Sequence, residues 1–286
     1  MSAKVDLSPA RDADYVKQIE SGRAQRVRRL QAPDGWLSLI GLHWLKDGRN
    51  TVGSAKDNDV VLAKGPAHLG VVTLTRGHAA IELAAGVDAT IDGRKLRSAE
   101  LQDDTHEQPT KIAFGTVSFH LIDRGGRKGL RVKDSDAETR THFLGIDYFP
   151  IDPSWRVEAK WVPFVPAHTL EIPTVLGTVD KMPVPGKAVF VRDGKTYELL
   201  PVLEEPDAKQ LWFIFADRTT GKQSYGAGRF LYADLPKDGT LTIDFNQAYN
   251  PPCAFTPYAT CPLAPPENRL GVAVEAGEKK YRGGHH

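Results

Sequence analysis

The sequence predicts a mainly β protein with an N-terminal helix, then a β-sandwich, and then a second module that is β-barrel-like or a β-sandwich. Short runs rich in β-branched and aromatic residues, separated by glycine, proline and asparagine turns, recur after residue 50. Amphipathic helical spacing is scarce in the same part of the chain. The chain has 286 residues, of which 41% are hydrophobic, and this is enough to fill the core of one large or two medium domains.

The first segment, residues 1–49, is predicted to hold the helix and an apolar stretch, both packed on the β modules. Tyr15 and Ile19 are sparse apolar residues at helical spacing in the charged run 12–30, which is typical of an amphipathic helix with one docked side. The dense apolar run 36–45 fits either a short helix or a buried strand, because periodicity alone does not separate the two.

Residues 50–140 are predicted to form the β-sandwich module. Strands and turns alternate at the expected spacing in NTVGS, NDVVLA, GVVTLT, AAIEL, ATIDG, KIAFGTVSFHLIDR and GLRVKD. Alternate residues of one of these strands point to one side: Val117, Phe119 and Leu121. His78 and His120 take strand positions, where we expect half-exposed strand residues and not ligands.

Residues 141–175 are predicted to be a proline-rich connecting segment. Proline cannot donate to a central ladder, so the prolines indicate edge strands or a linker between two modules. Residues 176–286 then form the C-terminal β module, which carries the expected pocket. Its strands are expected in KAVFVRDGKTYELLPVL, a hairpin that turns at Asp193–Gly194, and in QLWFIFADR, SYGAGRFLYADL, GTLTIDFNQ and RLGVAVEAGEKKY.

The composition argues against several classes of partner. The chain carries 37 basic and 36 acidic residues, and this balance gives no electrostatic reason to expect binding to nucleic acid. No stretch reaches the roughly 18–20 apolar residues that span a bilayer. The N-terminus also lacks the apolar core of a secretory signal. We therefore expect no membrane partner and a cytoplasmic location, and the oligomeric state stays open.

The segment TVGSAKDNDVVLAKGPAHLGVVTLTRGHAAI, with VDATIDGRKL and KIAFGTVSFHLI downstream, resembles the layout of forkhead-associated domains. The resemblance implies a sandwich shape. That family grips phosphate with a guanidinium that follows a glycine and with a Ser-x-x-His loop. Here Gly53 is followed by Ser54, and KGPAHLG stands in place of the loop. Because both phosphate-binding elements are missing, phosphopeptide recognition is not expected.

Three further segments carry a second resemblance: DGWLSLIGLHWLKDGRNTVGS, DRTTGKQSYGAGRFLYADLP and, above all, DFNQAYNPPCAFTPYATCPLAPPENRLGVAVEAGEK. Through them most of the chain resembles a bacterial family described as domain of unknown function 1684. The resemblance implies kinship and no particular chemistry.

The stretch 244–272 is unusually polar and rich in proline, and it is predicted to line a pocket. Thr242, Asp244 and Asn246 share one face of a strand by the period-two rule. Prolines stiffen the loops that follow, and stiff loops order side chains with little loss of entropy. The alternative is a loop that only covers a barrel end. The predicted catalytic candidates are Asp244, Cys253 and Glu267, and the predicted ligand-binding residues are Arg229, Tyr232, Asn246, Asn250 and Asn268.

The glycine-rich run TTGKQSYGAGRFLY contains Arg229, which is suited to clamp a carboxylate or phosphate of a small polar or anionic ligand. Glu278 joins the acid–base candidates, and His43 or His168 could serve as the base for a Cys253 nucleophile. No hydrolase elbow, zinc-protease or dinucleotide motif is present, so no enzyme class follows. The alternatives are a protein-interaction module built on the sandwich and a structural β-protein without a ligand.

Neither a cofactor nor a metal is expected. Cys253 and Cys261 lack the second ligand pair of a structural zinc site. Calcium needs a tight acidic loop, whereas DFNQAYN spaces its acceptors along a strand. In a reducing compartment the two cysteines are expected to be thiols, although a disulfide is geometrically possible.

Overall fold

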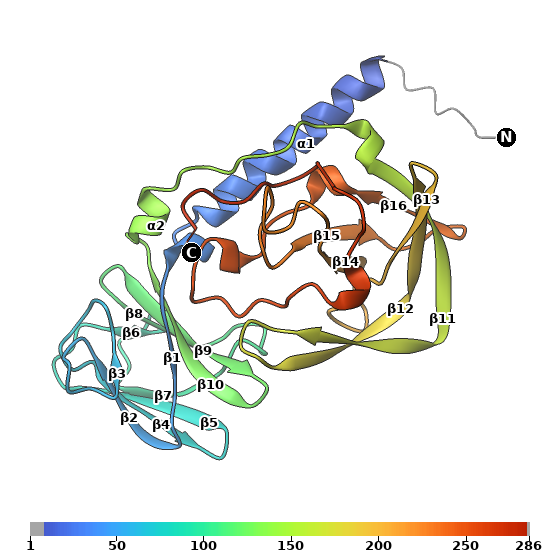
Figure 1. The fold of residues 1–286 in the computed structure, drawn as a ribbon. Helices are drawn as coiled ribbons and strands as arrows, with labels where there is room; N and C mark the ends of the chain where they lie inside the picture. Colours follow the sequence, from blue (N-terminus) through green and yellow to red (C-terminus); the bar gives the residue numbers. More distant parts are fainter. Residues whose placement is uncertain (1–8, 285–286) are drawn as a thin grey trace. The chain divides into compact units, whose positions relative to one another are not determined.

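The computed structural model describes residues 9–284, and it confirms the expected mainly β fold with one N-terminal helix. Helix α1 covers Pro9–Leu30, and the only other α-helix of the described part, α2 (Glu138–Thr141), is a single turn. None of the described helices is long and apolar enough to cross a bilayer. The chain divides into two compact units (Figure 1). The sandwich unit is Arg29–Phe143, and the C-terminal unit joins Leu144–His286 to the chain before Arg29.

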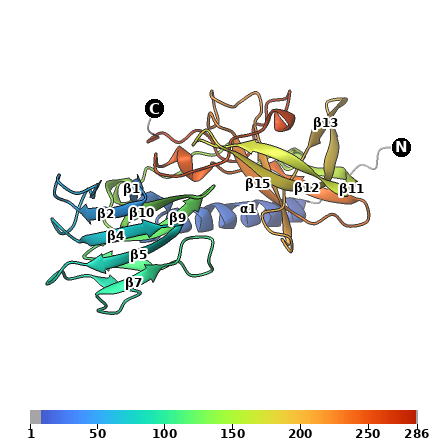
Figure 2. The ribbon, with the colours of Figure 1, turned by 90° about the horizontal axis from the view of Figure 1, so that it is seen from below.

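The sandwich unit has two five-stranded sheets. The first has the order β1 (Leu39–Trp44), β10 (Arg127–Asp134), β9 (Val117–Arg124), β8 (Lys111–Phe114) and β6 (Thr90–Ile91). The second has the order β3 (Val60–Val61), β2 (Gly48–Gly53), β4 (Gly70–Thr75), β5 (His78–Leu83) and β7 (Ser98–Leu101). Figure 2 shows β2, β4, β5 and β7 side by side in this order.

Apolar side chains from both sheets of the sandwich unit fill one core, as the strand periodicity predicted. Three alternate side chains of β9 are at most 2% exposed: Val117, Phe119 and Leu121. On the opposite face of β9, His120 is half-buried, while Ile122 is fully buried. The apolar run 36–45 combines both expected structures, because the 3-10 helix η1 (Trp36–Ser38) leads directly into β1.

The C-terminal unit contains a four-stranded and a two-stranded sheet. The larger sheet has the order β13 (Lys195–Leu199), β12 (Val179–Arg192), β11 (Arg156–Pro173) and β16 (Thr240–Asp244), and the smaller one pairs β14 (Gln210–Phe215) with β15 (Arg229–Asp234). The expected hairpin turn at Asp193–Gly194 is confirmed. Both residues have positive φ, 50° and 72°, as the tight two-residue turns of β-hairpins require.

Most of the second half of the proline-rich segment belongs to one long strand, β11. Arg156–Lys160 of β11 pair with β16, and residues 160–163 and 168–173 pair with β12. Only Lys160 pairs with both neighbours, so along most of its length β11 is paired on one side, as expected of an edge strand. Of the two expected alternatives, residues 156–173 therefore form a strand and not a linker. The prolines of β11 follow the rule that excludes proline from central ladders. Three of them lie where β12 is the only neighbouring strand of the described structure: Pro163, Pro166 and Pro173.

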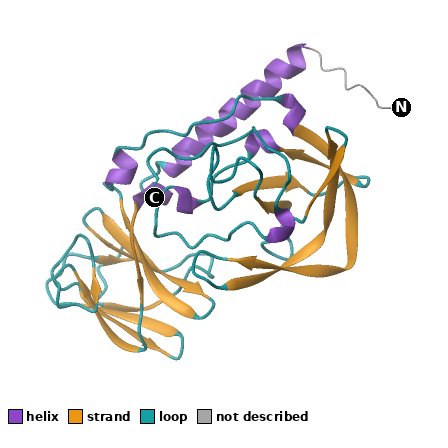
Figure 3. Cartoon of the chain, in the orientation of Figure 1, coloured by secondary structure: helices purple, strands orange, loops and turns teal. Residues whose placement is uncertain are grey.

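After β16 the described chain forms short 3-10 helices and irregular coil, drawn in teal in Figure 3. The 3-10 helices are η3 (Phe245–Gln247), η4 (Pro252–Ala254) and η5 (Pro266–Asn268). Asn246 therefore lies in η3, which the Asp244 side chain caps, and the expectation that both share a strand face is wrong. The strand expected in RLGVAVEAGEKKY is also wrong. Its backbone groups bond partly to side chains and partly to the main chain of several separate segments, and not to one neighbouring strand.

Candidate functional site

The C-terminal unit has an open pocket with a volume of about 450 Å³. Four parts of the chain line it: the segment before β11, the β12–β13 turn, the glycine-rich loop and the coil after residue 271. We refer to residues 272–279 as the pocket coil. The aromatic lining consists of Phe149 and Trp155, and the charged lining consists of Asp152, Arg192, Asp193, Glu275 and Lys279.

Two cations line this pocket without a carboxylate at ion-pair distance among residues 9–284. The Arg192 guanidinium stacks on Trp155, 3.5 Å from the ring centroid, and donates to the Ser154 carbonyl over 2.8 Å. The Lys279 Nζ lies 5.0 Å from the centroid of the Phe149 ring. The ring faces attract the cations and hold them at the pocket without neutralising their charge.

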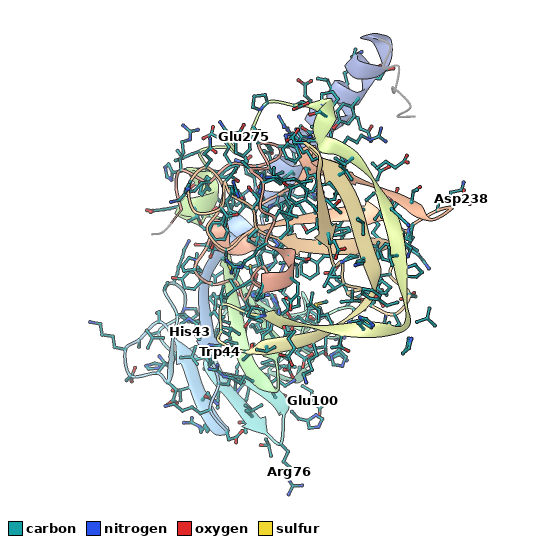
Figure 4. The ribbon with its side chains drawn as sticks, turned by 45° about the vertical axis from the view of Figure 1, so that its right-hand side comes forward. His43, Trp44, Arg76, Glu100, Asp238 and Glu275 are labelled. Carbon is teal, nitrogen blue, oxygen red and sulfur yellow. The ribbon has the colours of Figure 1, made fainter. Side chains whose placement is uncertain are left out.

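Three carboxylates give the same pocket a negative side. Asp152 accepts a backbone N–H over 2.8 Å and so caps the short 3-10 helix η2 (Pro153–Trp155), which orients the Trp155 ring. Asp193 lies in the hairpin turn, and Glu275 is exposed on the pocket coil (Figure 4). The pocket therefore presents both signs of charge.

Arg229 holds the pocket coil from inside the unit. Its side chain is 0% exposed, and its charge is paired with Asp217 at 2.8 Å. Burial lowers the pKa of Arg229, and the Asp217 carboxylate opposes that shift. The guanidinium also donates to three carbonyls of the pocket coil: those of Val274, Ala276 and Glu278. One planar, five-donor side chain thus satisfies backbone groups that a strand partner would otherwise take.

Glu278 ties the pocket coil to helix α1 and to the chain after β16. Its Oε1 accepts from Arg26 Nε over 3.1 Å, and its Oε2 accepts from the Asn250 amide over 2.7 Å. Asn250 is 0% exposed, and its Nδ2 donates to the Lys279 carbonyl over 2.8 Å. Burial raises the pKa of Glu278, and the Arg26 charge acts in the opposite direction. The carboxylate is therefore a structural tie within the unit.

Asn246 fixes the wall of the pocket that carries Asp152. Its Oδ1 accepts from the Asp152 amide over 3.0 Å, and its Nδ2 donates to the Asp152 carbonyl over 2.8 Å. Asp244 Oδ1 accepts from the Tyr15 hydroxyl over 2.9 Å. A buried amide, a carboxylate and a phenol thus join the end of β16 to helix α1 and to the pocket wall.

Comparison with known proteins places this part of the chain in a family. Residues 141–279 match the model of a family described as "Protein of unknown function (DUF1684)". The chain belongs to this family. The DUF1684 segment includes every residue that lines the pocket.

A solved structure is also similar to the chain. It is the solution NMR structure of an uncharacterized protein of Haloarcula marismortui, with 33% sequence identity over 49% of this chain and 78% of that chain, and with a TM-score of 0.42. No protein of curated function matches the chain. The forkhead-associated resemblance of the first half is not confirmed by these comparisons.

Other predicted residues of the DUF1684 segment lie away from the pocket. Asn268 is 1% exposed, and its amide bonds to both backbone groups of Leu200 and to the Ile214 carbonyl. Glu267 is exposed in η5. Tyr232 lines a separate pocket of about 370 Å³ and donates to Glu204 over 2.7 Å. These residues are not brought together at one place.

None of the predicted site residues lines the 450 Å³ pocket, but three of them hold its walls: Arg229, Asn246 and Asn250. The lining residues that sequence reasoning missed are Phe149, Trp155, Arg192 and Lys279. Turn signals in DPSW and RDGK mark two of these stretches. No periodicity or spacing in the sequence indicates that the two turns face the same pocket.

The histidines considered as bases lie in different surroundings. His43 belongs to β1 of the sandwich unit, and burial lowers its pKa. His168 is exposed and stacks on Phe164, with 3.9 Å between ring centroids. Within residues 9–284, no three His, Cys, Asp or Glu side chains gather into a group that could hold a metal.

Proposed function

We propose that the C-terminal unit binds a small polar molecule in the 450 Å³ pocket and holds its anionic group with Arg192 and Lys279. The observation that carries the proposal is the pair of cations held over aromatic rings without a carboxylate partner in the described structure. Such cations are available to a ligand. Pockets of roughly 300–1,000 Å³ accommodate small molecules.

The three carboxylates narrow the class of ligand. A purely anionic ligand would meet like charges at Asp152, Asp193 and Glu275, whereas a zwitterion can place its cationic group beside them. The proposed ligand is therefore a small molecule that carries a carboxylate or phosphate together with an amine. An amino acid is the simplest member of this class.

We propose binding and not a defined reaction. No serine, cysteine or histidine is among the described lining residues, so the pocket lacks the usual nucleophile and base pair. Asp244, a predicted catalytic candidate, is buried and engaged by Tyr15 and Asn246. We propose that the protein is a binding protein and that it is located in the cytoplasm.

A thermal-shift screen with free amino acids, dicarboxylates and sugar phosphates tests the proposal, because a ligand of the folded state raises the melting temperature. Zwitterions are expected to give the largest shifts. Titration calorimetry of the best compound should then show a Kd at least about 10-fold weaker for Lys279→Ala and for Arg192→Gln.

Lys195→Ala is the matched control for Arg192→Gln. Lys195 is an exposed cation just beyond the same hairpin turn, and it does not line the pocket. Its substitution should change the Kd by less than about twofold. The corresponding change in binding free energy is well below the roughly 1.4 kcal/mol of a tenfold effect. Compounds that bind all four proteins equally would place the ligand elsewhere and contradict the proposal.

A further inference from the structure

The chain between η4 and η5 brings the two cysteines together. The Cys253 amide donates to Cys261 Sγ over 3.2 Å, and the Cys261 amide donates to Cys253 Sγ over 3.3 Å. Both residues are thiols in this structure. Each sulfur therefore lies against the backbone of the other cysteine.

Backbone contacts fix this arrangement on both sides. The Cys261 carbonyl accepts from the Val175 amide over 3.1 Å, and Ala254 closes a turn onto the Pro251 carbonyl over 3.0 Å. Prolines at 251, 252 and 262 restrict the backbone next to both cysteines. The two thiols are thus held close to one another before any bond forms, and little further ordering is needed to join them.

Access to the two sulfurs differs. Cys253 is half-buried, whereas Cys261 is 6% exposed. Tyr225 of the glycine-rich loop lies by the pair, and burial, with the two cysteines as further causes, raises the pKa of its hydroxyl to about 12. The accessible thiol and the buried thiol have the unequal exposure expected of an attacking and a resolving cysteine.

We propose that Cys253 and Cys261 form a dithiol site that exchanges with an external disulfide of low molecular weight. This inference goes beyond the ligand pocket and does not depend on it. Residues 253–261 supply none of the side chains that line that pocket.

The exchange balances in two steps. The Cys253 thiolate attacks one sulfur of the external disulfide RSSR, the S–S bond breaks, and the first RS⁻ leaves and takes up a proton. The Cys261 thiolate then attacks the Cys253 sulfur of the mixed disulfide, and the second RS⁻ leaves and is protonated. Two thiols are oxidised to one intramolecular disulfide, and RSSR is reduced to two RSH.

The full-length protein, incubated in glutathione buffers of increasing oxidised fraction and then alkylated, tests the inference. The chain has 2 cysteines, so an intramolecular disulfide is necessarily Cys253–Cys261. Intact mass should fall by two hydrogen atoms relative to the reduced, unalkylated chain. Chymotrypsin cleavage after Phe255 or Tyr258 should yield two cysteine peptides that stay joined until a reductant is added.

Two variants separate the roles of the thiols. Cys261→Ser should accumulate the mixed disulfide of Cys253 with glutathione, because the resolving thiol is gone. Cys253→Ser should react at least about tenfold more slowly with oxidised glutathione, since access controls the attack. A folded wild-type protein whose thiols both stay alkylatable in fully oxidised glutathione would overturn the inference. So would equal reaction rates of the two variants.

Discussion

Buried amide and guanidinium side chains of the two units can bond to backbone groups at very different distances along the chain. In the sandwich unit, Asn50 is 1% exposed, and its side chain bonds to the backbone of Lys46, Gly48 and Val72, which lie in one turn and the adjoining strand. In the C-terminal unit, Arg229 and Asn268 bond to backbone groups that are between 45 and 68 residues away. Asn50 thus completes a turn, whereas Arg229 and Asn268 link segments that are distant in the sequence.

This difference shows how buried side chains can order an irregular chain. Residues 245–284 contain no strand of the described structure, yet much of this stretch is buried. Backbone groups cannot be buried without partners, so side chains with several donors must supply them. The polar residues that first suggested a ligand site are therefore, in large part, the framework that places the pocket walls.

The largest expected effect is the loss of stability on substitution of Arg229, and it should be confined to the C-terminal unit. Arg229→Met leaves Asp217 charged and buried without its partner, and it removes donors from the pocket coil. We expect a loss of about 3–5 kcal/mol in the free energy of unfolding of the C-terminal unit. Urea titration followed by hydrogen exchange of peptides from each unit measures it. Arg218→Met, which changes an exposed neighbour, should stay within about 0.5 kcal/mol.

His120 gives the sandwich unit a pH dependence of its own. Burial, with the Lys133 and Arg131 charges, lowers its pKa to about 4, whereas the unfolded value is about 6.5. The unfolded state then binds a proton that the folded state does not, so stability is full above pH 6.5 and falls as the pH drops towards 4. The loss is up to about 3 kcal/mol. His120→Gln should remove this part of the slope in urea titrations between pH 7 and 4, and an unchanged slope would contradict it.

Asn50 and Asn268 allow hydrogen bonds to nearby and to distant backbone groups to be compared. Asn50→Ala and Asn268→Ala should each cost about 1–3 kcal/mol, because each leaves buried backbone groups without partners. Hydrogen exchange should differ between them. Asn50→Ala should speed exchange only around its own turn, whereas Asn268→Ala should speed it near Leu200 and Ile214, which its amide links. Faster exchange limited to residues beside Asn268 would contradict the distant tie.

The smallest effect concerns the docking of helix α1. Tyr15→Phe removes the hydroxyl that bonds to Asp244 and keeps the ring. We expect a cost of about 0.5–1.5 kcal/mol, typical of one hydrogen bond. Faster exchange in α1, with the sandwich core unchanged, is the expected readout. A uniform change in both units would argue that the contact is not local to the C-terminal unit.

The sequence predicted most of the strands because their apolar residues alternate. Val117, Phe119 and Leu121 face the core as the period-two rule requires, and Asp193–Gly194 turns the hairpin as its residue types indicate. The sequence could not predict that residues 269–281 form irregular coil and not a strand. Their apolar residues read as a strand, and only the three-dimensional position of Arg229 reveals where their carbonyls bond.

The pocket could not be predicted from the sequence for a related reason. Arg192 and Lys279 are 87 positions apart in the numbering, and each resembles many other surface cations of the chain. What distinguishes them is that both line one pocket, each over an aromatic ring and without a carboxylate at ion-pair distance among the described residues. Both are properties of packing and not of local pattern.

The central claim is that buried side chains, and Arg229 above all, hold the pocket coil where a sheet would use a strand. Arg229→Lys tests it most directly, because the variant keeps the positive charge beside Asp217 but lacks the fork that reaches several carbonyls. The measurement is amide hydrogen exchange at Val274, Glu278 and Lys279, whose N–H groups bond to Asp217, Ala248 and Asp147. We predict exchange at least about tenfold faster at these amides, a change of about 1.4 kcal/mol, with β4 and β5 unchanged. Unchanged exchange in the pocket coil of a folded Arg229→Lys protein would contradict the account.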